Sequence, residues 1–373
     1  MIYLDHNATT PLDERVLDAM LPYLRGFYGN PSALYRLGRL ARTALDNARL
    51  EVAQLVAVKP SQVLFTSGAT ESNHLALLGL AAGSTPGIWF HGSTEHSSVM
   101  APLRVLERQG WTLKALPLKP SGEHDFRVSF EDDQKRPLAA TLMLANHETG
   151  VIESIAPLAR KVQDAGGWLH VDAVQGAGKI PLDFGAMGAH TLALSAHKLY
   201  GPKGVGALIV APEVTLTPMM GGGGQESGFR PGTEHVAGIV GFGQAARFAR
   251  LELASRQAHV LGLRLRLEAG LLALDAVTIF AKEALRLPNT VQFSVQGFDG
   301  EALVMLLDQR GFCVSSGSAC QSGGGAPSPV LLAMGVDETL AKGAIRVSLG
   351  VSNTQEEVDQ LIEALKDLTH LNE

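Results

Sequence analysis

The chain has 373 residues, a formal net charge of −6 at pH 7 and an apolar content of 46%. At about 150 residues per domain, this length predicts roughly two domains with a large core. The mild acidity and the absence of a long basic run argue against nucleic acid or an anionic membrane as the main partner. The sequence has no apolar stretch long enough to predict a transmembrane helix. Its first residues have no basic and apolar regions that would predict a secretory signal. Two cysteines, Cys313 and Cys320, exclude a disulfide scaffold and fit a reducing cytoplasm.

Short apolar runs alternate with helical patterns through the first 250 residues. This alternation predicts an α/β domain with a mostly parallel sheet, which we place at residues 15–250. A helix is expected over Arg39–Val56, because its apolar residues fall on one stripe. The predicted strands are Val63–Thr66, Gly87–His91, Thr141–Ala145, Trp168–Asp172, Thr191–Ser195 and Val205–Val210.

The pattern changes after about Gly243, and residues 251–373 are predicted to form a smaller α+β domain. We expect the N-terminal arm, residues 1–14, to pack on it. The last helix should begin near Thr354, whose spacing to Glu357 is typical of a capping box. The other predicted elements are helices over Phe248–Leu272 and Gly300–Leu307 and strands over Val277–Phe280, Thr290–Ser294 and Ala344–Ser348.

Five of the predicted strands of the large domain run into polar clusters. The carboxyl ends of parallel strands meet at one edge of a sheet, and open α/β sheets bind their ligands there. The sequence therefore predicts a site at this edge. The clusters are Thr66–Ser72, His91–His96, Asn146–Gly150, Asp172–Gln175 and Ser195–Lys198.

Three features of these clusters suggest a cofactor. Residues 67–70 follow a strand and precede a helix, so their backbone N–H groups and hydroxyls can bind a phosphate. Asp172 alone reads equally well as a turn cap, and Lys198 alone as a solvated lysine or as a Schiff-base lysine of lowered pKa. Together, a phosphate loop, an aspartate and a lysine at strand ends are the set that binds pyridoxal 5′-phosphate (PLP).

A zinc site is the competing interpretation of the histidines in these clusters. His91 and His96 are five residues apart, which is not the i, i+4 spacing of a helical zinc site. The sequence has no Cys-x-x-Cys pair either. We therefore predict no metal.

The two cysteines have different surroundings. Cys313 follows Phe312 in an apolar run and is predicted to fill the core. Cys320 stands among small and polar residues and is followed by Gly323–Gly325, which favours a loop over a core position. Its thiol, with an ordinary pKa of ~8.5, needs a nearby base or cation to act as a thiolate at neutral pH.

The sequence resembles the cysteine desulfurases of the NifS/IscS type, within the class V aminotransferases of PLP fold type I. The resemblance covers essentially the whole chain and implies a mostly parallel seven-stranded sheet between helices. Ser315–Cys320 is specific for this branch, whereas Ser195–Lys198 is common to the wider family. The other matching segments are Tyr3–Thr10, Gly29–Ser32, Thr66–Ser72, Thr94–His96, His170–Gln175, Gly228–Thr233 and Ile345–Gly350.

This resemblance implies an enzyme that converts L-cysteine to L-alanine. The sulfur would pass as a persulfide on Cys320 to an acceptor protein, for iron–sulfur cluster or other thio-cofactor synthesis in the cytoplasm. The enzyme would be a homodimer with shared active sites and without a nucleic-acid or membrane partner. The alternatives are a selenocysteine lyase or another class V enzyme such as an aminotransferase. A non-catalytic sulfur-transfer scaffold is disfavoured, because Lys198 and Arg346 are both present.

The resemblance also implies a role for individual residues. Lys198 would bond to the cofactor and move the Cα proton, and Cys320 would attack the substrate sulfur. His96 would stack on the pyridine ring and act as an acid–base group. Arg346 would bind the substrate carboxylate, with Asn30 nearby. The cofactor would further contact Ala69, Thr70, His147, Asp172, Gln175, Ser195 and His197, and Thr233 would reach the phosphate bound by the neighbouring subunit.

His147 departs from the family pattern. Family members usually carry Asn-Asn-Glu where this sequence reads Asn146-His147-Glu148. His147 therefore takes the place of an asparagine that contacts the ring oxygen of the cofactor. It would either make the same hydrogen bond or alter the pKa of the ring.

Overall fold

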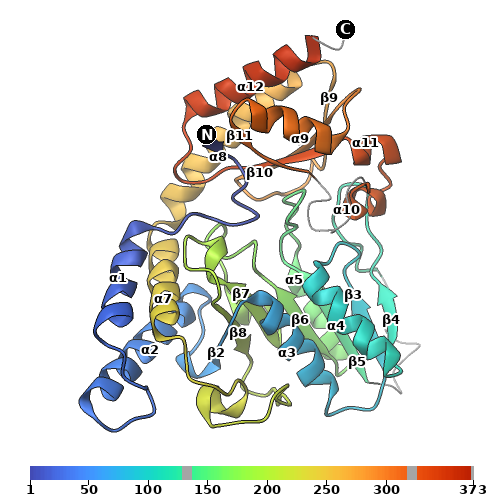
Figure 1. The fold of residues 1–373 in the computed structure, drawn as a ribbon. Coiled ribbons are helices and arrows are strands. Elements are labelled where there is room, and N and C mark those ends of the chain that lie inside the picture. The colour runs from blue at the N-terminus through green and yellow to red at the C-terminus, as the bar shows by residue number, and fades with distance from the viewer. Residues whose placement is uncertain (128–136, 317–325, 371–373) are drawn as a thin grey trace.

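The computed structural model describes residues 1–127, 137–316 and 326–370 (Figure 1). It consists of a large seven-stranded sheet between helices and a smaller body built on a four-stranded sheet. The predicted fold class is therefore confirmed. Cys320 lies outside the described residues. In the part of the chain that is described, no helix is long and apolar enough to cross a membrane.

The large sheet has the strand order β2-β8-β7-β6-β5-β3-β4. β8 pairs antiparallel with both of its neighbours, and the remaining pairs are parallel. The carboxyl ends of β2, β3, β5, β6 and β7 consequently share one edge, as the polar clusters predicted. The strands are β2 (Val63–Thr66), β3 (Ile88–His91), β4 (Thr112–Ala115), β5 (Leu138–Met143), β6 (Trp168–Asp172), β7 (Thr191–Ser195) and β8 (Gly206–Val210).

Helices cover both faces of this sheet (Figure 1). Successive side chains of a strand point to opposite faces, so each strand contributes to two apolar cores. Leu64 and Trp89 pack in the core beneath α3 and α4, whereas Phe65 and Phe90 pack in the core that includes α2, α5 and α7. The helices are α1 (Glu14–Arg25), α2 (Arg36–Leu55), α3 (Ala69–Ala81), α4 (Ser97–Arg108), α5 (Ile155–Asp164), α6 (Phe184–Met187) and α7 (Val236–Leu251).

The smaller body surrounds an antiparallel sheet of order β12-β13-β10-β9. Its core joins this sheet to α8, α9 and α12. Its strands are β9 (Val277–Ile279), β10 (Thr290–Val295), β11 (Phe312–Cys313), β12 (Ser315–Ser316) and β13 (Ala344–Ser348). Its helices are α8 (Leu253–Leu272), α9 (Gly300–Gln309), α10 (Pro329–Ala333), α11 (Glu338–Lys342) and α12 (Gln355–His370).

The N-terminal arm contacts both bodies. β1 (Ile2–Tyr3) pairs in parallel with β11 of the smaller body. Further along, the backbone N–H of Thr10 donates to the carbonyl of His197, and that of Asp13 donates to the carbonyl of Tyr200. The arm therefore crosses from one body to the other beside the edge where the polar clusters meet.

Most predicted elements occur within a few residues of their predicted bounds, but two predictions need correction and β4 has to be added. The helix over Phe248–Leu272 is in fact the end of α7 and the whole of α8, with non-helical backbone at Glu252 between them. β5 begins three residues earlier than predicted, at Leu138. β4 was not predicted, because an edge strand with mostly exposed side chains lacks the apolar run that marks a buried strand. The capping box of α12 is present, since Thr354 and Glu357 exchange hydrogen bonds.

Candidate active site

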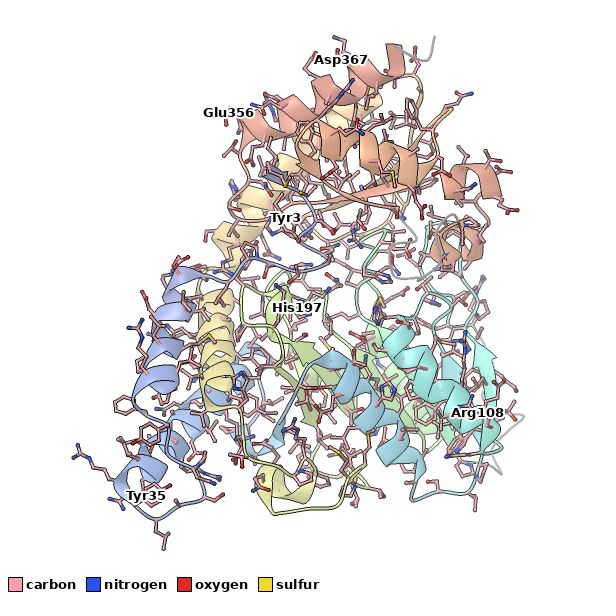
Figure 2. All side chains as sticks on the ribbon, in the orientation of Figure 1. Tyr3, Tyr35, Arg108, His197, Glu356 and Asp367 are labelled. Atoms are coloured by element: carbon pink, nitrogen blue, oxygen red, sulfur yellow. The ribbon has the colours of Figure 1, made fainter. Side chains whose placement is uncertain are left out.

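A cavity of about 770 Å³ opens at the carboxyl edge of the large sheet. Figure 2 shows His197 at this edge, between the large sheet and the smaller body. The cavity takes side chains from the arm and from both bodies, so neither body alone could form it. It brings together these residues predicted from the sequence: Ala69, Thr70, His96, His147, Asp172, Gln175, Ser195, His197, Lys198 and Arg346.

The N-terminus of α3 forms a cradle for an anion at one end of this cavity. Gly68 precedes α3 with a φ of 155°, a backbone conformation that residues other than glycine rarely adopt. Behind it, a Cβ added to Gly206 of β8 would lie 2.6 Å from the Cα of Gly68, so the strand approaches the loop backbone closely. The first N–H groups of a helix have no acceptor within the helix and point toward a bound anion. The residues around this end fit a phosphate group.

Neutral His197 lies beside this cradle. Burial, together with the charges of the neighbouring Lys198 and Lys203, lowers its pKa to about 4. Its Nδ1 lies 3.1 Å from the Oγ1 of Thr9 in the arm. Ser195, at the end of β7, also lines the cavity. The positive charge near the phosphate position is therefore supplied by the two lysines and the helix terminus.

Asp172 ends β6 with its carboxylate held from two sides. One oxygen accepts from the backbone N–H of Val174 at 3.0 Å, and the other accepts from Nδ2 of Asn73 at 2.9 Å. The side chain is buried yet lines the cavity. A fixed, buried carboxylate of this kind suits a cationic ring nitrogen.

His96 caps the N-terminus of α4, and its Nδ1 accepts from the backbone N–H of Ser98. Burial lowers its pKa; Asp172 opposes this effect and Lys198 adds to it. The ring of His147 stands edge-on to that of His96, with centroids 5.5 Å apart. The pKa of His147 also lies well below its usual value, mainly because of burial. Its Nδ1 is buried without a hydrogen-bond partner among the described residues, which leaves it available to a ligand.

Lys198 follows β7 in a short 3₁₀ helix, η3 (Ala196–Lys198). Its Nζ donates to the carbonyls of Asn7 and Ala8, at 2.5 and 2.8 Å. Gln175 donates from Nε2 to the same Asn7 carbonyl and accepts at Oε1 from Lys179, a lysine whose pKa burial lowers well below its usual value. The arm therefore holds two of the predicted cofactor ligands in place.

Arg346 projects from β13 of the smaller body into the cavity. One terminal nitrogen donates to the carbonyl of His147 at 2.9 Å, and the other pairs with Asp5 at 2.5 Å. Its Nε has no partner among the residues that the structure describes. A buried guanidinium in this position fits a carboxylate ligand.

Two predicted site residues do not line this cavity, and a third lies outside the described residues. Asn30 lies in the connection between α1 and α2, and its Oδ1 accepts from the backbone N–H of Ser32. Thr233 is exposed on the segment between η4 (Gln225–Gly228) and α7. Cys320 belongs to the segment that is not described. The roles of these three residues stay predictions.

The structure also adds residues that sequence reasoning missed: Asp5, Asn7, Asn73 and Lys179. Asp5 and Asn7 belong to the arm, which no strand-end argument could assign to the site. Asn73 is fully buried within α3, and a polar amide on the inner face of an apolar helix was the available signal. Lys179 gives no signal of its own, because its position behind Gln175 depends on the fold.

Comparisons with known proteins agree with this geometry. Residues 2–361 match the family model described as Aminotransferase class-V. The chain is 45% identical over 370 residues to a cysteine desulfurase IscS of Anaeromyxobacter sp. (strain Fw109-5), covering 97% of this chain and 90% of that protein. It is 42% identical over 377 residues to the cysteine desulfurase IscS of Aeromonas salmonicida (strain A449), covering 98% and 92%.

The fold comparison gives the same result. A NifS-like protein from Rickettsia africae ESF-5 superposes with a TM-score of 0.89 at 31% identity, over 99% of both chains. Another NifS-like protein gives a TM-score of 0.91 at 34% identity, again over 99% of both chains. The anion cradle, the fixed Asp172 carboxylate and the unpartnered Nδ1 of His147 fit the PLP that such enzymes use. The chain therefore belongs to the class V aminotransferase family of PLP-dependent enzymes, as a member of its NifS/IscS-type branch.

Proposed function

We propose that this chain is a cysteine desulfurase, which takes sulfur from L-cysteine, releases L-alanine and carries the sulfur on Cys320. The main support is that one cavity contains Lys198, Asp172 and the guanidinium of Arg346, and is bordered by Ser315. Ser315 lies in β12, five residues before Cys320 in the sequence. The described chain therefore reaches the cavity at Ser315, shortly before Cys320 in the sequence, and an aminotransferase does not need this thiol.

PLP, when bound, withdraws electrons from the Cα of an amino acid through its pyridine ring. Asp172 would pair with the ring nitrogen and His96 would stack on the ring. Nε2 of Gln175 donates one hydrogen to the carbonyl of Asn7, and its second hydrogen would bind the phenolic oxygen of the cofactor. Nδ1 of His147 would make a second contact with this oxygen. The phosphate would lie at the N-terminus of α3, within reach of the backbone at Ala69 and the side chains of Thr70, Ser195 and His197.

Arg346 would bind the carboxylate of L-cysteine. A guanidinium binds a carboxylate through two parallel hydrogen bonds, which fixes the orientation of the substrate as well as its position. Asp5 and the carbonyl of His147 orient the guanidinium from behind. The substrate carboxylate then competes with Asp5 for the charge of Arg346.

Lys198 would carry the proton that leaves the Cα. Its Nζ rests on two backbone carbonyls of the arm, Asn7 and Ala8, which accept hydrogen bonds but carry no full charge. These two hydrogen bonds hold the amine in place. The amine can therefore leave them when substrate is bound.

Cys320 would then attack the sulfur of the substrate as a thiolate. A bond forms between the two sulfurs and the Cβ–S bond of the substrate breaks, with its electron pair left on Cβ. A proton added to Cβ completes the alanine, and Cys320 keeps the sulfur as a persulfide. The persulfide would pass its outer sulfur to an acceptor protein, such as one that assembles iron–sulfur clusters.

The active enzyme would be a homodimer. The connection between α1 and α2 exposes large apolar side chains, including Tyr28 and Leu34, which are 80% and 88% exposed in the single chain. The segment that carries Thr233 follows η4, whose buried Glu226 pairs with Arg49 of α2. A second copy covering this face would bring Thr233 toward the phosphate bound by its neighbour.

The test compares the purified wild type with Cys320→Ala. With L-cysteine and a thiol reductant, we expect the wild type to release alanine over many turnovers. The variant should fall to background while its PLP absorbance and affinity stay unchanged. Equal alanine release by the two proteins would refute the persulfide step and favour a selenocysteine lyase, which L-selenocysteine as substrate would then reveal.

A further inference from the structure

Asn73 connects the two groups that would contact the PLP ring. It lies in α3 with its side chain fully buried. Its Nδ2 donates to Asp172 and to the Oγ of Ser98, both at 2.9 Å. Its Oδ1 lies 2.9 Å from Nε2 of His170. One amide therefore makes three hydrogen bonds, and all its partners are buried.

The partners allow only one orientation of this amide. A carboxylate oxygen only accepts hydrogen bonds, so Asp172 must face the nitrogen of Asn73 and not its oxygen. The oxygen then faces His170, which must donate from Nε2. Burial lowers the pKa of His170 to about 3, so its ring is neutral and its Nδ1 accepts from the hydroxyl of Thr191 at 2.9 Å.

The same accounting fixes the proton of His96. The Oγ of Ser98 accepts from Asn73, so its single hydrogen is directed to Nδ1 of His96 at 2.8 Å. The backbone N–H of Ser98 donates to this Nδ1 as well, at 3.1 Å. A ring nitrogen that accepts two hydrogen bonds cannot carry a proton. Neutral His96 therefore has its proton on Nε2, and the lone pair of its Nδ1 accepts from Ser98.

We propose that Asn73 is a positioning residue, which sets the Asp172 carboxylate and the Nε2–H tautomer of His96 through one buried amide. The partner of the ring nitrogen and the residue stacked on the ring then act as one hydrogen-bonded unit. This inference rests on the proposed function for the identity of the ligand. It concerns groups that can be observed before any substrate is added.

Two variants separate the two branches of this unit. Asn73→Asp keeps the size of the side chain but removes both N–H donors, so it acts on Asp172 and on Ser98 together. Ser98→Ala removes only the hydroxyl that faces His96. Thr141→Val is the matched control: Thr141 is buried in β5, and its Oγ1 has no hydrogen-bond partner among the described residues.

The measurements are ¹⁵N NMR of histidine-labelled full-length holoenzyme without substrate and the dissociation constant of PLP. His96 is assigned by the signals lost in His96→Gln. In the wild type we expect an unprotonated Nδ1 and a protonated Nε2 at His96. Asn73→Asp should weaken PLP binding at least about tenfold, the factor expected for the loss of a hydrogen bond to a charged group, and shift both His96 signals.

Ser98→Ala should shift the His96 signals but change PLP affinity less than about threefold, since it leaves the Asp172 branch intact. Thr141→Val should change neither. A protonated Nδ1 in the wild type would overturn the proposal, as would an Asn73→Asp protein with unchanged signals and unchanged PLP affinity. Neither measurement involves L-cysteine, so failure of the desulfurase assay would leave this result standing.

Discussion

His170 shows at the scale of one residue how the stability of the folded chain depends on pH. Its side chain is fully buried in β6, and burial lowers its pKa to about 3, against about 6.5 in an unfolded chain. Between these values the unfolded state binds a proton that the folded state does not. The contribution of this histidine to the free energy of unfolding is therefore fully present above about pH 6.5, and it is lost as the pH decreases toward 3.

We expect this single histidine to remove about 2 kcal/mol from the free energy of unfolding between pH 7 and pH 5. Urea unfolding of the full-length protein at several pH values measures the slope. His170→Asn should be less stable at pH 7 because it alters a packed core, but its pH dependence should be flatter by that amount. An unchanged slope would show that His170 is not the group that takes up the proton.

Residues at the ends of strands were predictable from the sequence, and residues behind them were not. Asp172, Ser195 and Lys198 follow apolar runs, so the direction of a parallel sheet assigns them to one edge. Asn7 and Lys179 meet Gln175 only because the arm crosses between the two bodies. No local pattern encodes that crossing.

At the scale of secondary-structure elements, the backbone of β8 lies close to the loop before α3. Gly206 pairs with Thr66 across the two strands, and a Cβ on it would lie 2.6 Å from both the Cα of Gly68 and the carbonyl oxygen of Leu194. Both contacts are backbone atoms, so the clash cannot be relieved by a side chain. Gly206→Ala should push the loop away and weaken PLP binding by at least about tenfold, as expected if one charge-assisted hydrogen bond is lost.

The measurement is again the PLP dissociation constant, with circular dichroism to follow folding. Gly262→Ala is the control, because a Cβ at this exposed position of α8 meets nothing within 4 Å and alanine favours a helix by about 1 kcal/mol. It should bind PLP as the wild type does. If Gly206→Ala did so too, the cradle would not depend on the close approach of β8.

The predicted and observed ends of helices and strands agree best where one side of the element is buried. Phe248–Leu272 looked like a single helix because its helical periodicity continues across Glu252. The turn between α7 and α8 follows from packing, since α7 belongs to the core of the large sheet and α8 to that of the smaller body. Tertiary contacts of this kind override local propensity.

At the scale of the whole molecule, the arm makes the site depend on both bodies. Asn7 accepts from Lys179 of the large body and donates from Nδ2 to Thr290 of the smaller one, while Asp5 pairs with Arg346. The substrate and cofactor residues therefore keep their spacing only while the bodies stay docked. A neighbouring subunit that adds Thr233 would extend the same dependence beyond one chain.

The double variant Tyr28→Asp with Leu34→Asp tests this extension. Two carboxylates on the exposed apolar face should prevent its burial, so we expect a monomer in sedimentation velocity where the wild type is a dimer. Loss of Thr233 of the neighbour should also weaken PLP binding, although the fold and thermal unfolding of each chain persist. Leu285→Asp is the control, because Leu285 is 69% exposed but belongs to the connection between β9 and β10 of the smaller body. If the wild type sediments as a monomer, no neighbour contributes to the site. If the double variant still dimerises, the two chains meet through another face. A monomeric double variant with unchanged PLP affinity would mean that each chain completes its own phosphate site.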